Sequence, residues 1–144
     1  MRRIGEAVRR GVRYHHRPGA YALLPLGGAL LVAAKTAPRP DFLLPGGGVD
    51  PGEGVLQALH REVREETGWS IARPRRLGAF RRFVWMDDYD MWGEKVCHVF
   101  VAHPVRPLGP PSEPDHVGAW IPLADAPWLL SVEGERAFAA RLAG

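Results

Sequence analysis

Residues 47–69 read GGVDPGEGVLQALHREVREETGW, and this stretch carries most of what the sequence predicts about fold and chemistry. Its second half, residues 54–67, predicts a helix. The preceding segment, residues 50–53, supplies turn and helix-start signals, and Gly68 supplies the stop. On a helical wheel the apolar residues form one stripe that we expect to face the core, namely Leu56, Leu59 and Val63, with Thr67 adjoining it.

Three glutamates lie beside that stripe. Glu62 is i,i+4 to Glu66 and i,i+3 to Glu65, so the three side chains stack along one helix edge. Like charges at these spacings repel, and burial next to a core would disfavour their ionised forms further. A hard divalent cation such as Mg²⁺ or Mn²⁺ would resolve this conflict. Considered alone, the helix fits equally well a solvated face held by pairs such as Arg61 with Glu65.

The glycine run before the helix favours a binding site. Pro45-Gly46-Gly47-Gly48 ends a short apolar stretch and lets the backbone pass close to a ligand. Its N–H groups could meet phosphate and one of its carbonyls could join a metal. No Gly-Lys-Ser/Thr follows, so the run is not a P-loop, and no G-x-G-x-x-G fingerprint is present.

The whole stretch resembles the Nudix box, G-x5-E-x7-R-E-U-x-E-E-x-G-U, where U is a bulky hydrophobic residue. Every fixed position is filled, by Gly47, Glu53, Arg61, Glu62, Glu65, Glu66 and Gly68. Val63 fits the first U, whereas Trp69 stands at the last U, where an aliphatic residue is commoner. The resemblance implies a metal-dependent hydrolase that cleaves the diphosphate linkage of a nucleoside triphosphate, a nucleotide sugar or a dinucleoside polyphosphate.

The same resemblance implies a role for each matching residue. It implies that Glu62, Glu65 and Glu66 are metal ligands and catalytic residues, and that the carbonyl of Gly46 is an additional ligand. Arg61 becomes a catalytic-site residue that pairs with Glu53 and positions the loop. Gly47, Glu53 and Gly68 are expected to be structural, and the metal ions to activate a water for in-line attack on phosphorus.

The general base remains open at this level. A box glutamate is one candidate, and Glu113 and Asp115 in the later segment SEPDHVGAW are distal candidates. A second acidic cluster, formed by Asp87, Asp88, Asp90 and Glu94, fits a solvated hairpin turn better than a catalytic site.

Substrate contacts are predicted only as a set of candidates. Arginines could hold terminal phosphates and aromatic side chains could stack on a base; the candidates are Arg13, Arg17, Arg81, Arg82 and Trp85, with Phe83, Tyr89 and Trp92. Each fits a core or surface role equally well.

Outside the box, the hydrophobic pattern predicts an α/β or α+β fold in one domain, residues 1–144. We expect a hairpin of residues 20–24 and 29–34, a short strand at 42–44, strands at 75–85 and 94–105, a proline-rich loop at 104–114, a strand at 117–121, and helices at 124–130 and 132–143. Nudix domains share this plan, so the resemblance implies a mixed sheet sandwiched between helices.

Composition and charge set further limits. The net charge is +3, and its excess lies in residues 1–17, which we expect to be a solvated and partly flexible basic segment. A phosphate-attracting rim and a transit-peptide look-alike are the alternatives for this segment. No apolar stretch reaches the length of a membrane span, and a single cysteine, Cys97, suits a reducing compartment, so we expect a cytoplasmic protein.

The partners that this pattern favours are small nucleotide-like molecules. No aromatic-basic interleaving supports a nucleic-acid surface, so only a capped or triphosphate RNA end fits. The resemblance also allows a homodimer. Two other functions stay open: a Nudix-fold module that senses a nucleotide without cleaving it, and an isomerase of an isoprenoid diphosphate. The complete box speaks against the first, and Cys97 lies in no recognisable isomerase motif.

Overall fold

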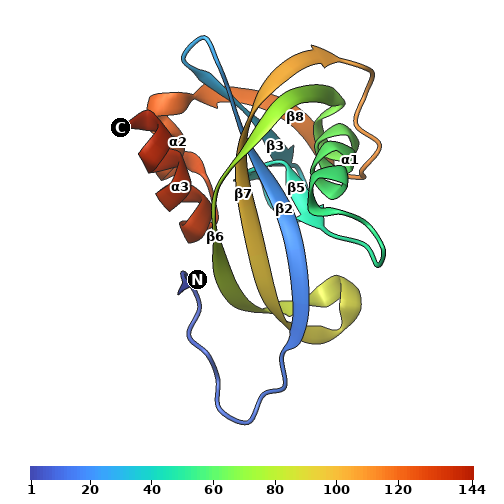
Figure 1. Ribbon diagram of the computed structural model, residues 1–144, viewed down its shortest axis with the longest axis vertical. Coiled ribbons are helices and arrows are strands. Elements are labelled where there is room, and N and C mark those ends of the chain that lie inside the picture. Colours follow the sequence, from blue (N-terminus) through green and yellow to red (C-terminus); the bar gives the residue numbers. More distant parts are fainter.

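The computed structural model describes residues 1–144 and consists of a mixed sheet with helices on both faces (Figure 1). The strands are β1 Arg2–Arg3, β2 His15–Leu26, β3 Ala29–Lys35, β4 Asp41–Leu43, β5 Gly46–Gly48, β6 Trp69–Met86, β7 Met91–Pro107 and β8 His116–Pro122. The helices are α1 Val55–Thr67, α2 Ala126–Leu129 and α3 Glu133–Ala143, with short 3₁₀ turns at Asp87–Tyr89 and Leu123–Asp125. The predicted α+β architecture is confirmed.

The sheet has eight strands in the order β1-β6-β7-β2-β3-β4, with β5 on β2 and β8 on β3. Strands β2 and β7 run parallel from His15 opposite Gly93 to Leu23 opposite Val101, and β6 pairs antiparallel with β7. The predicted leading hairpin is β2–β3, and its turn residues Gly27 and Gly28 have φ of 58° and 81°. Such positive φ values suit the primed turns that connect two-residue hairpins.

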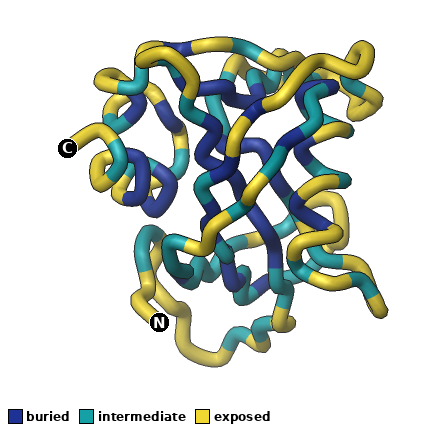
Figure 2. The backbone as a smooth tube through the Cα atoms, turned by 45° about the horizontal axis from the view of Figure 1, so that its top comes forward, coloured by how far each residue is buried: buried dark blue, intermediate teal, exposed yellow.

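Two buried clusters lie on the two faces of the sheet. One contains Leu23, Val99, Phe80 and the α3 residue Phe138, and the other contains Ala22, Leu24, Phe100 and the α1 residues Leu59 and Val63. Figure 2 shows the central strands as the buried part of the chain and the N-terminal segment as mostly exposed. The sheet therefore separates α1 from α2 and α3, and each helix layer has its own core.

The orientation of α1 differs from the wheel prediction. Leu56, expected in the core stripe, is 47% exposed, whereas Ala58, Leu59, Val63 and Thr67 are buried. The buried arc is therefore rotated toward the glutamate edge of the helix. Gly68 ends α1 with φ of 79°, and its N–H donates to the carbonyl of Arg64, as the predicted stop signal requires.

The segment predicted as a proline-rich loop at residues 104–114 is partly a strand, because β7 continues to Pro107. The parallel ladder between β2 and β7 ends at Val101, so β7 has no β2 neighbour beyond that point. The missing N–H of Pro104 therefore interrupts no ladder on that side, which explains why proline is tolerated in this strand.

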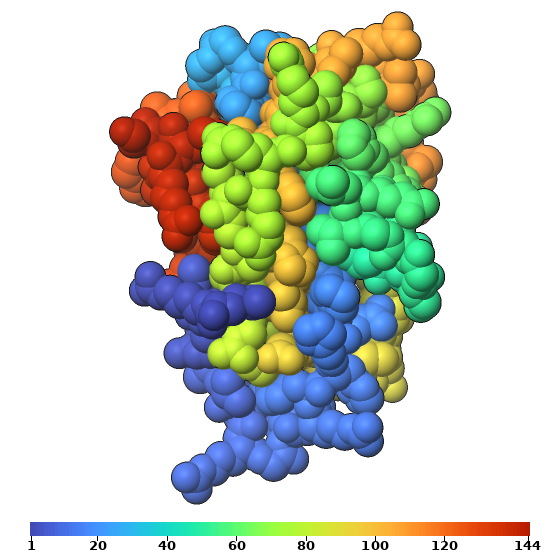
Figure 3. Space-filling model, viewed as in Figure 1, coloured from blue at the N-terminus to red at the C-terminus, as the bar shows by residue number.

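The basic N-terminal segment runs along the edge of the sheet. Arg2 and Arg3 pair parallel with Phe80 and Arg81 of β6, and the N–H of Ile4 donates to the carbonyl of Arg81. Figure 3 shows this segment against the lower part of β6. None of the helices has the length and apolar character that a bilayer crossing requires.

Candidate active site

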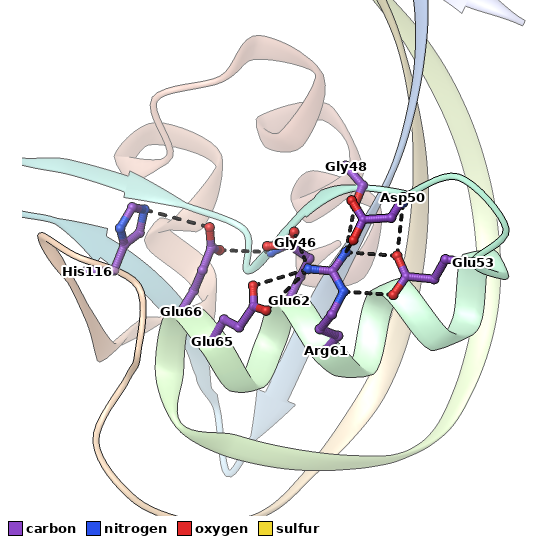
Figure 4. Close-up of polar contacts among 9 residues, drawn as sticks. All are labelled: Gly46, Gly48, Asp50, Glu53, Arg61, Glu62, Glu65, Glu66 and His116. Carbon is purple, nitrogen blue, oxygen red and sulfur yellow. Dashed lines mark hydrogen bonds and ion pairs between the residues drawn. The ribbon is translucent and has the colours of Figure 1, made fainter. Parts of the chain in front are cut away.

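The glycines of β5 bring the backbone against the glutamate edge of α1 (Figure 4). An added Cβ at Gly47 would lie 2.5 Å from the carboxyl carbon of Glu62, so this position has no room for a side chain. The N–H of Gly46 donates to Oε1 of Glu66 at 3.0 Å. At Gly46 an added Cβ would collide with the carbonyl of Ala20. Close approach of neighbouring groups therefore requires glycine at positions 46 and 47.

Arg61 connects the helix to the loop that precedes it. Its Nε donates to Glu53 Oε2 at 2.7 Å and one terminal nitrogen to Glu53 Oε1 at 2.8 Å, a two-bond contact. The same nitrogen donates to the carbonyl of Gly48 at 2.9 Å. The other terminal nitrogen reaches Glu62 at 3.0 Å and Glu65 at 3.2 Å. Arg61 therefore fixes the loop on α1 and partly neutralises the glutamates.

The carboxyl groups of this site have pKa values shifted in opposite directions. Hydrogen bonds from Arg61 lower the pKa of Glu53 to about 2. Burial raises the pKa of Glu66 to about 8, the hydrogen bond from Gly46 opposes that shift, and the neighbouring charges of Glu62 and Glu113 add to it. Burial also raises the pKa of Glu62. Two of the three box glutamates are therefore costly to ionise in the protein without a cation.

The segment after β7 returns to the end of α1. The carbonyl of Glu65 accepts the N–H groups of Ser112 and Glu113, both at 2.9 Å, and the carbonyl of Gly68 accepts the N–H of Leu108. At the start of β8, Nε2 of His116 lies 3.7 Å from Oε2 of Glu66. The distal segment is thus attached to the helix that carries the box glutamates.

A cavity of about 340 Å³ opens on this site from the α3 side of the sheet. Its wall contains Glu66, Glu113 and His116, and also Arg17, Met86 and Tyr89. An adjoining cavity of about 340 Å³ is lined by Glu62 and shares Arg17, Pro18, Gly48 and Tyr89 with the first. The two glutamates therefore open on neighbouring parts of one cleft.

Three cationic residues form a row across the floor of the first cavity. Arg17 of β2 pairs in register with Lys95 of β7, which pairs in register with Arg82 of β6. In-register residues of adjacent strands share one face, and all three line the cavity, as does Lys35 of β3. Only Arg82 has a carboxylate partner, Glu6 at 3.0 Å, while Arg17 lies 4.4 Å above the ring of Tyr89. Such a row attracts an anionic ligand.

The candidate residues outside the box fall into two groups. Glu113, Arg17 and Arg82 line the cavity that contains Glu66. Asp115 does not line it, and its carbonyl is held by Thr36. Arg13 is exposed and lines none of the described cavities, and Arg81 pairs with Glu94 on the opposite face of β6.

Of the aromatic candidates, Tyr89 lines the cavity, whereas Phe83, Trp85 and Trp92 lie beside it. Trp85 is 43% exposed, donates its indole N–H to Asp87 at 2.7 Å and borders a neighbouring open depression with Phe83, Tyr89 and Trp92. Of the second acidic cluster, Asp87 and Asp88 belong to the 3₁₀ turn between β6 and β7, and Asp88 also reaches the cavity wall.

Several cavity residues were not singled out from the sequence, namely Tyr21, Lys35, Lys95, His116 and Glu135. Lys95 is two residues before the core residue Cys97, so strand alternation alone points its side chain inward. Glu135 precedes Phe138 by three residues, so helical spacing puts a carboxyl on the apolar face of α3. These two signals are present in the sequence, whereas the placement of Lys35 and His116 depends on long-range pairing.

The donor set fits a hard divalent ion by its chemistry. Three carboxylates and the backbone of β5 offer only oxygen ligands, which suit Mg²⁺ or Mn²⁺. The close packing of Glu62 on Gly47 and of Glu66 on Gly46 holds two of these carboxylates against β5. No three acidic, histidine or cysteine side chains converge on one point, and the guanidinium of Arg61 pairs with Glu62 and Glu65.

Comparison with known proteins identifies the family. The NUDIX domain matches residues 15–142, and the chain therefore belongs to the Nudix family. A MutT Nudix hydrolase from Burkholderia pseudomallei has a similar structure, with a TM-score of 0.68 and 27% identity over 89% of this chain and 98% of that one. A MutT protein from Methanosarcina mazei Go1 has a TM-score of 0.71 at 21% identity, over 91% of this chain and 95% of that one.

One curated relative is similar over part of its length. A protein of Bacillus subtilis (strain 168), named "Putative 8-oxo-dGTP diphosphatase", is 41% identical over 63 residues. Those residues are 44% of this chain and 41% of that protein, so the match spans less than half of either.

Proposed function

We propose that this protein is a metal-dependent pyrophosphohydrolase that cleaves the diphosphate linkage of a nucleoside polyphosphate. The observation that carries the proposal is the position of Glu62 and Glu66, which are held against the β5 glycines where they open on a cleft with a cationic floor. Carboxylates that are costly to ionise, beside a cavity that attracts anions, suit a site that binds cations and phosphates together.

Glu62, Glu65 and Glu66, with the carbonyl of Gly46, would hold the metal ions, and Mg²⁺ and Mn²⁺ are the ions that this donor set suits. A bound divalent ion neutralises phosphate oxygens and lowers the pKa of a coordinated water. Arg61 keeps the loop and the helix in register through Glu53 and Gly48. Its role is therefore to position the glutamates.

Glu113 is the distal residue that we propose as general base. It lines the cavity with Glu66, and its own N–H is anchored on the carbonyl of Glu65, so its backbone is fixed relative to the helix. In this scheme Glu113 removes a proton from the attacking water while the phosphorus–oxygen bond to the leaving phosphate breaks. Asp115 lies outside the cavity wall and is the weaker candidate.

For the substrate we propose a nucleoside triphosphate. Arg17 and Lys95 line the cavity beside Arg82, and their positive charges suit the phosphates of such a substrate. The partial similarity to a relative named for 8-oxo-dGTP supports the same class. We also propose that the protein acts in the cytoplasm on free nucleotides.

Isoprenoid-diphosphate isomerisation receives no support from Cys97. Burial raises the pKa of its thiol to about 11, so the thiol is protonated near neutral pH and is a weak nucleophile. Cys97 also packs in the core cluster with Val99 and Phe80.

The test is a panel of nucleoside triphosphates, nucleotide sugars and dinucleoside polyphosphates, assayed with Mg²⁺ or Mn²⁺ on the wild type and on Glu66→Gln. We expect turnover of a triphosphate by the wild type, and a loss of about a hundredfold or more in the variant, as for removal of a metal or acid–base group. Glu133→Gln, an exposed glutamate on α3, is the matched control and should keep full turnover.

Three results would contradict the proposal. Near wild-type turnover by Glu66→Gln would remove this residue from the mechanism. Nucleotide binding without phosphate release at any metal concentration would indicate a sensing module. Metal-dependent isomerisation without hydrolysis would indicate the isomerase.

A further inference from the structure

The first half of β6 carries exposed arginines that have no acidic partner. Arg73, Arg75 and Arg76 are all exposed, and none of them forms an ion pair. Residues 67–86 and 95–112, which include most of β6 and β7, contain no aspartate or glutamate. Figure 3 shows this part of β6 on the near face of the molecule, next to α1 and α3. The positive charge of these arginines is therefore not neutralised within the hairpin that carries them.

Side chains of β7 extend this positive surface. Nδ1 of His98 lies 3.3 Å from a terminal nitrogen of Arg76, and Arg106 is exposed near the end of β7. Partial burial lowers the pKa of His98, and the charge of Arg76 lowers it further. We call this group the β6 surface; its members are Arg73, Arg75, Arg76, His98, His103 and Arg106. At the usual rise of a strand it extends for about 25 Å along β7.

The backbone of β6 exposes these arginines without requiring them. The register of β6 against β7 shifts between Ala72 and Arg75 and again between Arg76 and Gly78. Bulges of this kind re-aim the side chains beside them. Arg73 has φ of 53°, a left-handed conformation that is unfavourable for a residue with a Cβ. Glycine would suit that backbone better, so the stability of β6 does not account for an arginine at position 73.

The β6 surface is extended and has few apolar anchors. No large apolar side chain is exposed within residues 70–84. Protein partners are usually held by apolar or aromatic anchors in pockets, and single-stranded nucleic acids by aromatic side chains that stack on bases. A duplex requires neither, because its phosphates lie at short, regular intervals along its outside and are bound by positive charge. Cations spread along two strands suit such a linear polyanion better than a single small anion.

We infer that the β6 surface is a docking site for the phosphate backbone of duplex nucleic acid, which it binds without reading the base sequence. Each arginine can donate to phosphate oxygens through its planar fork of N–H groups. No residue of the β6 surface lines any of the described cavities, so this site is separate from the cleft and the inference does not depend on the proposed hydrolysis. The lack of aromatic-basic interleaving in the sequence argues against stacking on single strands, and duplex binding does not need it.

The test is a fluorescence anisotropy titration in EDTA, with the full chain and a labelled blunt-ended DNA duplex of about two helical turns without 5′-phosphates. We expect a dissociation constant of about 10 µM or lower near about 50 mM NaCl. The logarithm of the association constant should fall against the logarithm of the salt concentration with a slope of about −3.6, since each of four arginine contacts contributes about −0.9. Duplex RNA of the same sequence is the second arm and shows which backbone the β6 surface prefers.

Paired substitutions locate the binding surface. Arg75→Gln combined with Arg76→Gln should weaken duplex binding about tenfold or more and make the salt slope less steep by about 2. Arg10→Gln combined with Arg39→Gln removes two exposed arginines elsewhere, changes the net charge equally and should keep the affinity within about twofold. Glu66→Gln should bind the duplex as the wild type does, because the cleft is not involved. Equal midpoints of urea denaturation for both double variants and the wild type show that any loss of binding concerns the surface and not the fold.

Four results would overturn the inference. Equal weakening by the two double variants would indicate attraction by net charge alone. Tighter binding of single-stranded DNA, or of a labelled polyglutamate peptide, would indicate a different partner. No binding of either duplex at millimolar protein concentration would exclude the site. Self-association of the Arg75→Gln and Arg76→Gln double variant with unchanged duplex binding would show that these arginines only protect the edge of the sheet. Because the assay contains no divalent metal and no nucleotide, a failure of the hydrolase proposal would appear only in the earlier substrate panel.

Discussion

The absence of a side chain at Gly47 allows the carboxyl of Glu62 to lie against β5. The carboxyl of Glu62 occupies the space where a side chain at position 47 would begin. We expect Gly47→Ala to push that carboxyl away and to weaken Mn²⁺ binding and turnover about tenfold or more, because displacement of a ligand acts as a change in its supporting residue does.

The measurement for Gly47→Ala is a Mn²⁺ titration of turnover, with Gly54→Ala as the control. A Cβ at Gly54 meets no atom within 4 Å, so that variant should titrate as the wild type does. Identical Mn²⁺ curves for Gly47→Ala and wild type would show that Glu62 needs no fixed position against β5.

At this scale the sequence predicted the pairing of Arg61 with Glu53 but missed several residues that line the cavity. Arg61 and Glu53 pair as expected, because a fixed spacing of eight residues across one loop and helix is a local property. Glu135 and Lys95 come from α3 and β7, and their common cavity arises only when those elements pack on the sheet. No local pattern in the sequence encodes that meeting.

Among the elements, the stability of α1 depends on Gly68, the residue that ends the helix. Gly68 has φ of 79°, and an added Cβ there would collide with the carbonyl of Gly109 in the returning segment. We expect Gly68→Ala to lower the free energy of unfolding by about 2 kcal/mol or more, the sum of a left-handed residue and a steric conflict. Urea denaturation of the purified variant measures this loss.

The control for this prediction is Gly52→Ala. Gly52 has φ of 80° but open space around its Cα, so alanine there should cost only the backbone term of about 1 kcal/mol. Equal unfolding free energies for the two variants would show that the steric conflict with Gly109 adds nothing to the cost of Gly68→Ala.

The elements themselves were predicted largely from patterns within short windows. The hairpin turn at Gly27-Gly28, the end of α1 at Gly68 and the last helix all follow from local residue chemistry. The rotation of α1 was not predicted, since Leu56 is apolar yet exposed. The sheet, rather than hydrophobicity alone, selects the buried arc, because Glu62 and Glu66 must reach β5.

For the whole molecule, Glu135 links stability to pH. Its pKa is about 7 in the folded protein, above the usual value of 4.5, because burial disfavours its charged form. The folded state therefore binds more protons than the unfolded state between these values, and stability falls as pH rises through this window. The loss has an upper limit of about 3 kcal/mol and is complete above pH 7.

Glu135→Gln removes that loss, because glutamine stays neutral at all pH values. We expect the variant to gain in unfolding free energy, relative to the wild type, between pH 5 and pH 8, as measured by urea denaturation at each pH. Glu66 titrates with the same sign, since burial raises its pKa as well, so the difference between variant and wild type is the informative quantity. A difference that is constant with pH would mean that Glu135 is charged throughout.

The strand at Arg2–Arg3 and Glu6, which forms an ion pair with Arg82, lie before residue 15, where the match to the NUDIX domain begins. Residues before the start of the domain match therefore contribute to the sheet and to the cavity. A chain trimmed to the domain match would expose the outer edge of β6, and an exposed strand edge can pair with other chains and aggregate. Such trimming would also remove the carboxylate partner of Arg82, so the cavity floor would carry more positive charge than in the full chain.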